Sequence, residues 1–250
     1  MLDLQQNGTG SGRFSGIGIH KRFGSLRVLE DVDFSMGLSE AVGIVGPNGA
    51  GKTTLLATLS GAYPPSAGRV SFDGRDVTRQ TSAERCKAGI VRTHQVPKPF
   101  SGMTAFENAY VAAAHSDAAS RDEAYERAIH ALELCGMLAV ANRKAETLGL
   151  LDRKRLELAR ALATGPKVLL LDEIGGGLTD SEAQELVVTI QELKRRGIGI
   201  VWIEHIVHVL LQVVDRLICM DAGKIIADGD PKTVMSDPEV VKAYLGGGPK

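Results

Sequence analysis

The hydrophobic positions at the start of the chain follow strand-like patterns. Apolar residues alternate with polar ones around Ile17 to Phe23 and Val28 to Phe34, and the run Ala41 to Val45 is apolar throughout. Alternation is typical of a strand with one buried face, whereas a fully apolar run is typical of a central strand in a parallel sheet. This part of the chain therefore predicts a small sheet that leads into the first strand of a buried one.

The rest of the chain alternates between helical and strand-like segments. Predicted helices begin near Leu55 and cover Arg153 to Thr164, Asp180 to Arg196 and Ile206 to Val214. Predicted strands are Arg69 to Phe72, which turns at Asp73-Gly74 as an edge hairpin, Ile90 to Thr93, Val168 to Leu171, Ile198 to Ile203 and Leu217 to Met220. This order predicts an α/β fold.

Two features refine the helix predictions. Between Pro97 and Gly149 the sequence is Ala-rich, with helices expected at Thr104 to His115 and Arg121 to Leu138, which indicates a helical subdomain inserted at about residues 97–160. Thr179 and Glu182 have the spacing of a capping box before the helix at Asp180, and Gly197 is placed to end that helix.

Composition narrows the function classes. With 250 residues, 29 basic and 30 acidic side chains, and 44% hydrophobic content, the chain is expected to form one globular domain over residues 13–250. Its net charge of -1 argues against nucleic acid as a partner. Three widely spaced cysteines indicate neither a disulfide framework nor a zinc site and fit the cytoplasm. Residues 1–12 are polar, lack a signal-peptide core and are expected to be a flexible leader, and no stretch reaches the roughly 18 apolar residues of a membrane span.

A phosphate-binding loop follows the buried strand at Ala41 to Val45. It matches the pattern G-x4-G-K-T and consists of Gly46, Pro47, Asn48, Gly49, Ala50, Gly51, Lys52, Thr53 and Thr54. Its glycines let backbone N–H groups surround a phosphate chain, and the following helix directs its positive end at the same place. Lys52 supplies a mobile positive charge, and the hydroxyl of Thr53 is expected to hold Mg²⁺.

A second motif ends another buried strand. Val168 to Leu171 are aliphatic, and Asp172 and Glu173 follow them directly. In α/β folds the carboxyl ends of the strands border the ligand site. Asp172 is therefore expected to reach Mg²⁺ through a water, and Glu173 to polarise an attacking water as general base. The two motifs together predict binding, and also hydrolysis, of a nucleoside triphosphate.

With these motifs in place, the sequence resembles the nucleotide-binding subunit of ATP-binding-cassette (ABC) transporters from about Phe14 to Gly247. It is similar in particular to the branched-chain amino acid import group, through residues 152–164, the three glycines after Glu173 and the tail at residues 227–246. The resemblance implies an α/β P-loop NTPase fold of ABC-cassette type. That fold has a RecA-like, mostly parallel core sheet, an N-terminal antiparallel β subdomain and an inserted α-helical subdomain.

The resemblance also implies roles for single residues. Gln95 is similar to the glutamine that reaches Mg²⁺ and the water, on a loop that senses the membrane subunit. His205 is similar to the switch histidine that contacts the γ-phosphate and holds Glu173, although a lone histidine is more often structural. Phe23 is similar to the aromatic residue that stacks on adenine, and the alternative is a core phenylalanine on an edge strand.

The family signature Leu-Ser-Gly-Gly-Gln is degenerate here. It aligns with Leu148, Gly149, Leu150, Leu151 and Asp152. The signature acts on ATP held by the opposite subunit, so its loss is expected to weaken the partner's site. We expect Asp152 to cap a helix that starts at Arg153 and to disfavour a nearby phosphate, and Leu151 to add bulk. Ile174 also replaces a usual proline, and Gly175 to Thr179 form an unusually glycine-rich loop.

The resemblance implies an ATP-binding and ATP-hydrolysing subunit of an importer for branched-chain amino acids or related small organic solutes, with ATP and Mg²⁺ as cofactors. Its expected partners are membrane-spanning permease subunits, contacted through Pro97 to Phe106, a second cassette subunit and an external solute-binding protein. A heterodimer of cassettes is favoured, and a homodimer is the alternative. The expected location is the cytoplasm, peripheral on the inner face of the membrane. Rival interpretations are a soluble non-transport ABC ATPase and a weakly hydrolysing ATP-binding partner.

Overall fold

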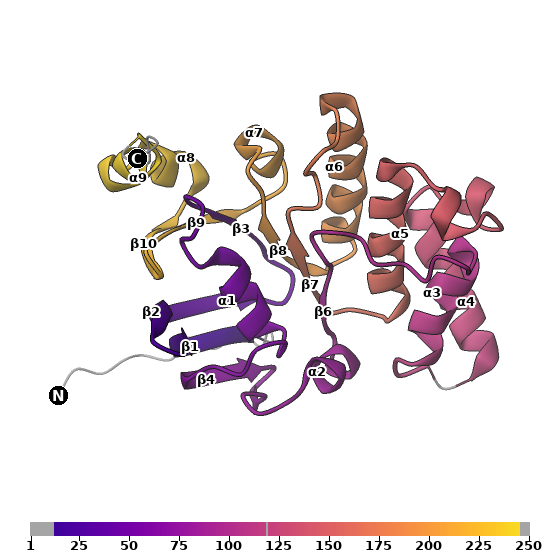
Figure 1. Cartoon of the computed structure of the whole chain (residues 1–250), viewed down its shortest axis with the longest axis horizontal. Coiled ribbons are helices and arrows are strands. Elements are labelled where there is room, and N and C mark those ends of the chain that lie inside the picture. The colour runs from indigo at the N-terminus through magenta and orange to yellow at the C-terminus, as the bar shows by residue number, and fades with distance from the viewer. Residues whose placement is uncertain (1–12, 119, 246–250) are drawn as a thin grey trace.

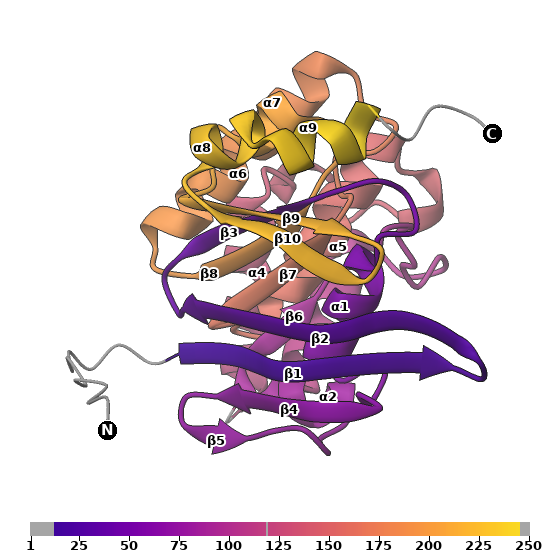
Figure 2. The same ribbon diagram turned by 90° about the vertical axis from the view of Figure 1, so that its left-hand side faces the viewer.

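The computed structural model describes residues 13–118 and 120–245, and the predicted leader at residues 1–12 lies outside this part of the chain. The described residues form two sheets with helices around them (Figures 1 and 2). One sheet has four strands in the order β2-β1-β4-β5, and the other has six in the order β10-β9-β3-β8-β7-β6. The strands are β1 (Arg13–Phe23), β2 (Leu26–Gly37), β3 (Ala41–Val45), β4 (Ala67–Phe72), β5 (Arg75–Asp76), β6 (Ile90–Arg92), β7 (Val168–Asp172), β8 (Gly199–Ile203), β9 (Arg216–Asp221) and β10 (Lys224–Gly229).

The six-stranded sheet is mostly parallel, as the sequence predicts. β3 pairs in parallel with both β8 and β9, and β7 pairs in parallel with β8 and β6, whereas β10 runs antiparallel to β9. Every residue of β3, β7 and β8 is buried. These three strands are therefore covered on both faces, which explains their uninterrupted apolar sequences.

The four-stranded sheet is antiparallel and packs over helix α1 (Lys52–Leu59). Phe14 on β1 packs edge-on against Phe34 and Phe72, with ring centroids 6.1 and 5.6 Å apart. These rings share one buried cluster with Leu55 and Leu56 of α1 and with the inner residues of the large sheet. The helix that follows the phosphate loop is thus held between the two sheets (Figure 2).

The helices lie around the large sheet, and α3, α4 and α5 pack together at one end of it (Figure 1). None of the helices in the described ranges combines the length and the apolar character that crossing a membrane requires. Besides α1, the α-helices are α2 (Ser82–Ala88), α3 (Ala105–Ala114), α4 (Arg121–Leu134), α5 (Leu150–Ala163), α6 (Asp180–Arg195), α7 (Val207–Leu210), α8 (Pro231–Ser236) and α9 (Pro238–Leu245), and the 3-10 helices are η1 (Leu138–Val140) and η2 (Ala145–Thr147).

Several helix boundaries differ from the sequence predictions. The helix predicted near Leu55 begins at Lys52, because the phosphate loop leads directly into it. α4 ends at Leu134 rather than at Leu138, since Gly136 has a left-handed backbone and the N–H of Met137 closes the helix on the carbonyl of Leu132. The helix predicted over Ile206 to Val214 is a single turn followed by further turns.

α2 was not predicted from the pattern of apolar residues, but the residues that begin and end it are typical of a helix. Thr81 and Glu84 form a complete capping box at its start, and Gly89 ends it with a left-handed backbone. The capping box predicted for α6, between Thr179 and Glu182, is present in the same form. Both helices therefore begin where the side chain of a threonine satisfies a backbone N–H group.

Arg85 of α2 is buried and binds the end of α1. Its Nη1 donates to the carbonyls of Thr58 and Leu59, each at 2.7 Å, and its Nε donates to the carbonyl of Val77 at 3.1 Å. The side chain is 0% exposed, and burial lowers its pKa to about 10. A buried guanidinium here satisfies the last carbonyls of the phosphate-loop helix, which have no partners within the helix.

We predict that Arg85→Met destabilises the fold by about 2 to 4 kcal/mol, because it removes buried hydrogen bonds to several carbonyls and leaves that of Leu59 without its donor. Arg79→Met removes the same charge from an exposed position nearby and is expected to change stability by less than about 0.5 kcal/mol. Urea denaturation of both variants measures the difference. Equal stability of the two variants would show that α1 does not depend on Arg85.

Candidate functional site

The loop between β3 and α1 has a backbone that only glycine adopts easily at three positions, Gly46, Gly49 and Gly51. Gly46 has φ 144°, and a Cβ on it would lie 2.1 Å from the carbonyl oxygen of Met220. Gly51, with φ 100°, is the N-cap of α1 and provides no side-chain cap. The first N–H groups of α1 are therefore available to a ligand, and the positive end of the helix favours an anion.

A cavity of about 240 Å³ lies at this loop. It is lined by Val28, residues 48–54 and Glu173. Glu173 is thus brought to the phosphate loop although 119 positions separate it from the end of the loop at Thr54 in sequence. Val28, at the beginning of β2, is a lining residue that the sequence patterns do not single out.

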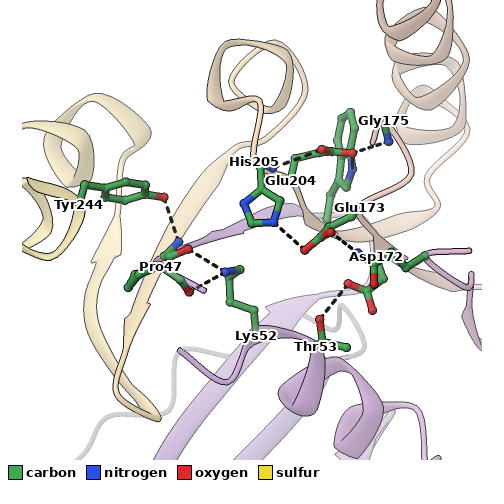
Figure 3. Close-up of polar contacts among 12 residues, drawn as sticks. Pro47, Lys52, Thr53, Asp172, Glu173, Gly175, Glu204, His205 and Tyr244 are labelled. Atoms are coloured by element: carbon green, nitrogen blue, oxygen red, sulfur yellow. Dashed lines mark hydrogen bonds and ion pairs between the residues drawn. The ribbon is translucent and has the colours of Figure 1, made fainter. Parts of the chain in front are cut away.

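Lys52 is turned toward its own loop. Its Nζ donates to the carbonyls of Gly46 at 2.7 Å and Pro47 at 2.9 Å (Figure 3). The side chain is only 5% exposed, and burial lowers its pKa against the opposing effects of Glu173 and Asp172. The ammonium group therefore has neutral acceptors and no directly paired carboxylate, an arrangement in which a phosphate would be a stronger partner.

Asp172 is buried and joins two elements. Its Oδ1 accepts the hydroxyl hydrogen of Thr53 at 3.2 Å, and its Oδ2 pairs with Nη2 of Arg92 at 2.7 Å. The structure thus brings the predicted metal-binding residues Thr53 and Asp172 together. Arg92, from β6, is a partner that sequence reasoning missed.

The donor set fits Mg²⁺ when a nucleotide supplies further ligands. A hydroxyl and a carboxylate oxygen are hard ligands of the kind that Mg²⁺ prefers, and Mg²⁺ at nucleotide sites usually takes few protein ligands besides phosphates and waters. Across residues 13–118 and 120–245, no three His, Cys, Asp or Glu side chains converge in a way that could hold a metal by themselves. A cation at Thr53 and Asp172 would therefore depend on the phosphates.

Glu173 is held from two sides. His205 Nε2 lies 2.8 Å from Glu173 Oε1, and Gln95 Nε2 donates to Oε2. Figure 3 shows the imidazole and the carboxylate facing each other above Lys52. The predicted base, the switch histidine and Gln95 are thus in contact, and Gln95 reaches Glu173 directly.

Phe23 lies apart from the cavity. It packs edge-on against Tyr63, with 5.2 Å between the ring centroids. Nζ of Lys21 lies 4.8 Å from the centroid of the Phe23 ring. It is 42% exposed and is not among the residues that line the cavity. Its role as an adenine platform remains a prediction.

The structure corrects one part of the signature prediction. α5 begins at Leu150 with Gly149 as its N-cap, so Asp152 lies inside the first turn and is not the cap of a helix from Arg153. The reason is that Gly149 already has the extended backbone that an N-cap requires. Leu148 is buried, Leu150 is 48% exposed, Leu151 is half-buried, and Asp152 pairs with Arg155 at 3.7 Å.

Tyr244 of the C-terminal helix also contacts the loop. Its hydroxyl accepts the N–H of Gly46 at 2.9 Å, as Figure 3 shows. Tyr244 and Gly46 are separated by 198 positions, so no local sequence pattern could have indicated this contact. The first glycine of the loop is therefore held through its N–H by Tyr244 and through its carbonyl by Lys52.

Comparisons with known proteins agree with this geometry. The sequence model of the ABC transporter family matches residues 29–175, and that of the branched-chain amino acid ATP-binding cassette transporter matches residues 224–249. The chain is 34% identical to the high-affinity branched-chain amino acid transport ATP-binding protein BraF of Pseudomonas aeruginosa, over 92% of this chain and 96% of BraF. It is also 34% identical to LivG of Escherichia coli K12, a protein with the same description, with the same coverage.

Solved structures show the same fold. The structure of the ADP conformation of MJ1267, an ATP-binding cassette of an ABC transporter, has a TM-score of 0.86 and 33% identity, covering 95% of this chain and all of that one. A nucleotide-free ATP-binding cassette from an ABC transporter has a TM-score of 0.84 and 32% identity, covering 93% and 98%. The phosphate loop, the paired carboxylates and these similarities show that the chain belongs to the ABC transporter family and is an ATP-binding cassette ATPase.

Proposed function

We propose that this chain is the ATP-hydrolysing subunit of an importer for branched-chain amino acids or related small organic solutes. The contact of Glu173 with both His205 and Gln95 at the phosphate-loop cavity carries the catalytic part of the proposal. The solute class is supported by the names of BraF and LivG and by the family match at residues 224–249.

ATP binding would exchange contacts that already exist at the phosphate loop. Lys52 would release the carbonyls of Gly46 and Pro47 and bind phosphate oxygens, and the N–H groups of residues 49–54 would surround the phosphate chain. Thr53 and Asp172 would hold Mg²⁺, with Gln95 beside them, and the ion would neutralise phosphate charge. Phe23 would stack on adenine if it turns from Tyr63 toward the nucleotide.

Hydrolysis needs a base that holds and deprotonates a water. The carboxylate of Glu173 is 16% exposed and lines the cavity, so it can contact a water beside the terminal phosphate. His205 holds one of its oxygens and Gln95 the other. This arrangement fixes the direction of the carboxylate, and His205 would also contact the terminal phosphate.

A loop with exposed apolar side chains is the proposed contact with the permease. Val96 is 66% exposed, Phe100 47% and Met103 37%. Buried Asn108 fixes the loop through hydrogen bonds to the backbone of Phe100 and Thr104. Since Gln95 lies at the start of the same loop and contacts Glu173, a shift of the loop on the permease would reach the base directly.

The assembly proposed here holds two cassettes, permease subunits and an external solute-binding protein, with the chain peripheral on the cytoplasmic face of the membrane and ATP and Mg²⁺ as its cofactors. A heterodimer is favoured because Leu150 and Leu151 occupy the place of the signature glycines, so a more orthodox partner would complete one of the two sites. The rival function as a soluble non-transport ATPase is not favoured, because the relatives above are transport subunits.

We predict that Glu173→Gln reduces ATP turnover at least about 100-fold, with ATP affinity within about twofold of normal, because the amide cannot accept the proton of the water. Glu126→Gln, on the exposed face of α4, is the matched control. Phosphate release and binding of a fluorescent ATP analogue measure the two quantities. Normal turnover of the Glu173 variant would refute its role as base.

We predict that Leu151→Gly combined with Asp152→Gln raises ATP turnover of the complete transporter, because it removes bulk and negative charge beside the partner's γ-phosphate. The single variants separate the two effects. Turnover of the purified assembly measures the outcome, and no change in any of the three variants would show that the degenerate signature does not limit hydrolysis.

We predict that the chain, purified from its native membranes in mild detergent, retains membrane-spanning subunits that mass spectrometry identifies. Val96→Asp is expected to reduce their recovery at least about fivefold, because a charge in an apolar contact must be desolvated. Val188→Asp, on the exposed face of α6, is the control. Recovery of soluble partners alone would favour a non-transport ATPase instead.

A further inference from the structure

The backbone of Glu173 is strained and is held by groups from three segments. Glu173 has φ 49°, a left-handed conformation that costs a non-glycine residue about 1 kcal/mol or more. Its N–H donates to the carbonyl of Ile203 at 2.9 Å, and its carbonyl accepts the N–H of Gly176 at 3.2 Å. The same carbonyl lies 3.4 Å from Nζ of Lys154, which donates to it.

Lys154 is a buried cation that the proposed chemistry does not use. It is 5% exposed, in the second turn of α5, two positions after the last residue of the degenerate signature. Burial lowers its pKa, while the charges of Glu204 and Glu173 oppose that effect. Burying a lysine costs free energy unless its ammonium group is paired or hydrogen-bonded, and Lys154 donates a hydrogen bond to the backbone carbonyl of Glu173.

Glu204 secures the loop that follows Glu173. This carboxylate is 3% exposed and accepts the N–H of Gly175 at 2.5 Å, the Nε1–H of Trp202 at 3.3 Å and the N–H of His205 at 3.3 Å. A Cβ on Gly175 would lie 2.8 Å from Oε1 of Glu204, so a larger residue here would displace that carboxylate from its present position. The carboxylate therefore connects the glycine loop directly to the switch histidine (Figure 3).

We propose that Lys154 and Glu204 are positioning residues that hold Glu173 and its glycine loop in the geometry for hydrolysis. Lys154 acts on the carbonyl of Glu173, and Glu204 acts on Gly175 and on the backbone of His205. The inference rests on the proposed role of Glu173 as base.

Glycine content explains why the loop needs these contacts. Gly175, Gly176 and Gly177 follow one another, and each glycine has more backbone freedom to lose than any other residue. Without Lys154, the strained conformation of Glu173 has only two backbone hydrogen bonds to hold it. A carboxylate that samples several directions spends less time beside the water, which lowers turnover while leaving the phosphate loop unchanged.

The test compares Lys154→Met with Arg153→Met in the purified complete transporter. Lys154→Met keeps the length of the side chain and removes the ammonium group, whereas Arg153 is exposed. We expect Lys154→Met to reduce single-turnover ATP hydrolysis about tenfold, with affinity for a fluorescent ATP analogue within about twofold and hydrolysis by the Arg153 variant unchanged. Lys154→Arg keeps a donor and is expected to restore most of the rate.

The same Lys154 substitutions in the Glu173→Gln variant test whether Lys154 acts through Glu173. If Lys154 acts through Glu173, Lys154→Met causes no further loss in that background, because positioning a side chain that cannot act as base has no value. An equal tenfold loss in both backgrounds, unchanged turnover of Lys154→Met, or an equal loss of ATP affinity would overturn the inference. Normal turnover of Glu173→Gln alone would instead refute the proposed base.

Glu204→Gln provides an independent measurement should Lys154→Met fold poorly. The amide keeps one acceptor oxygen but presents a donor to one of the N–H groups that the carboxylate now binds. Turnover is expected to fall about threefold to tenfold with unchanged ATP affinity. Full turnover of this variant would remove Glu204 from the proposal.

Discussion

The functional site depends on the pairing of parallel strands at one edge of the large sheet. β8 lies between β3 and β7, and Ile203 of β8 is level with Ile44 on one side and with Asp172 on the other. The strands therefore end together, and the chain that leaves each of them carries the phosphate loop, Glu204-His205 or Glu173 to the same place. β6 is the next strand, and Gln95 follows it. A shift of one register would separate these groups and turn the strand's side chains to the opposite face.

The charged groups at this edge already have hydrogen-bonding partners within the chain. Asp172 is 0% exposed and pairs with Arg92, while Lys52 binds two carbonyls of its own loop. Buried ions without partners are costly, so these contacts make the nucleotide-free fold stable. Each of these contacts would compete with a bound nucleotide, because Lys52 would have to leave its carbonyls and Arg92 would have to share Asp172 with a cation. The free energy of nucleotide binding would therefore be the difference between the contacts made with the nucleotide and the contacts that the nucleotide-free chain already has.

Sequence patterns revealed the parts of the site that are local. The phosphate loop and the Asp172-Glu173 pair are contiguous motifs next to buried strands. The residue types in each motif suit the local backbone that the motif forms, so a short stretch of sequence is enough to identify it. Arg92, Lys154, Glu204 and Tyr244 could not be found in this way, because each contacts a residue from a distant segment. Asp152 was assigned wrongly as a cap because its side chain suits that position, whereas the backbone of Gly149 starts the helix earlier. The contact of Gly175 with Glu204 is another that local patterns cannot reveal, because the two residues are 29 positions apart.

The degenerate signature departs from the family pattern in two ways, through the charge of Asp152 and through the bulk of its leucines, and the two have different surroundings. Asp152 lies 3.7 Å from Arg155, which also pairs with Glu185 of α6, so part of the negative charge of Asp152 is balanced within the subunit. Leu150 departs from the signature by its size. It is 48% exposed, and its Cδ2 would lie 3.3 Å from a Cβ on Gly177, so it occupies space next to the glycine loop. The charge of Asp152 is thus partly balanced by a neighbour, whereas the bulk of Leu150 remains next to the glycine loop. Leu150 therefore stands both at the signature position and next to the loop that follows Glu173.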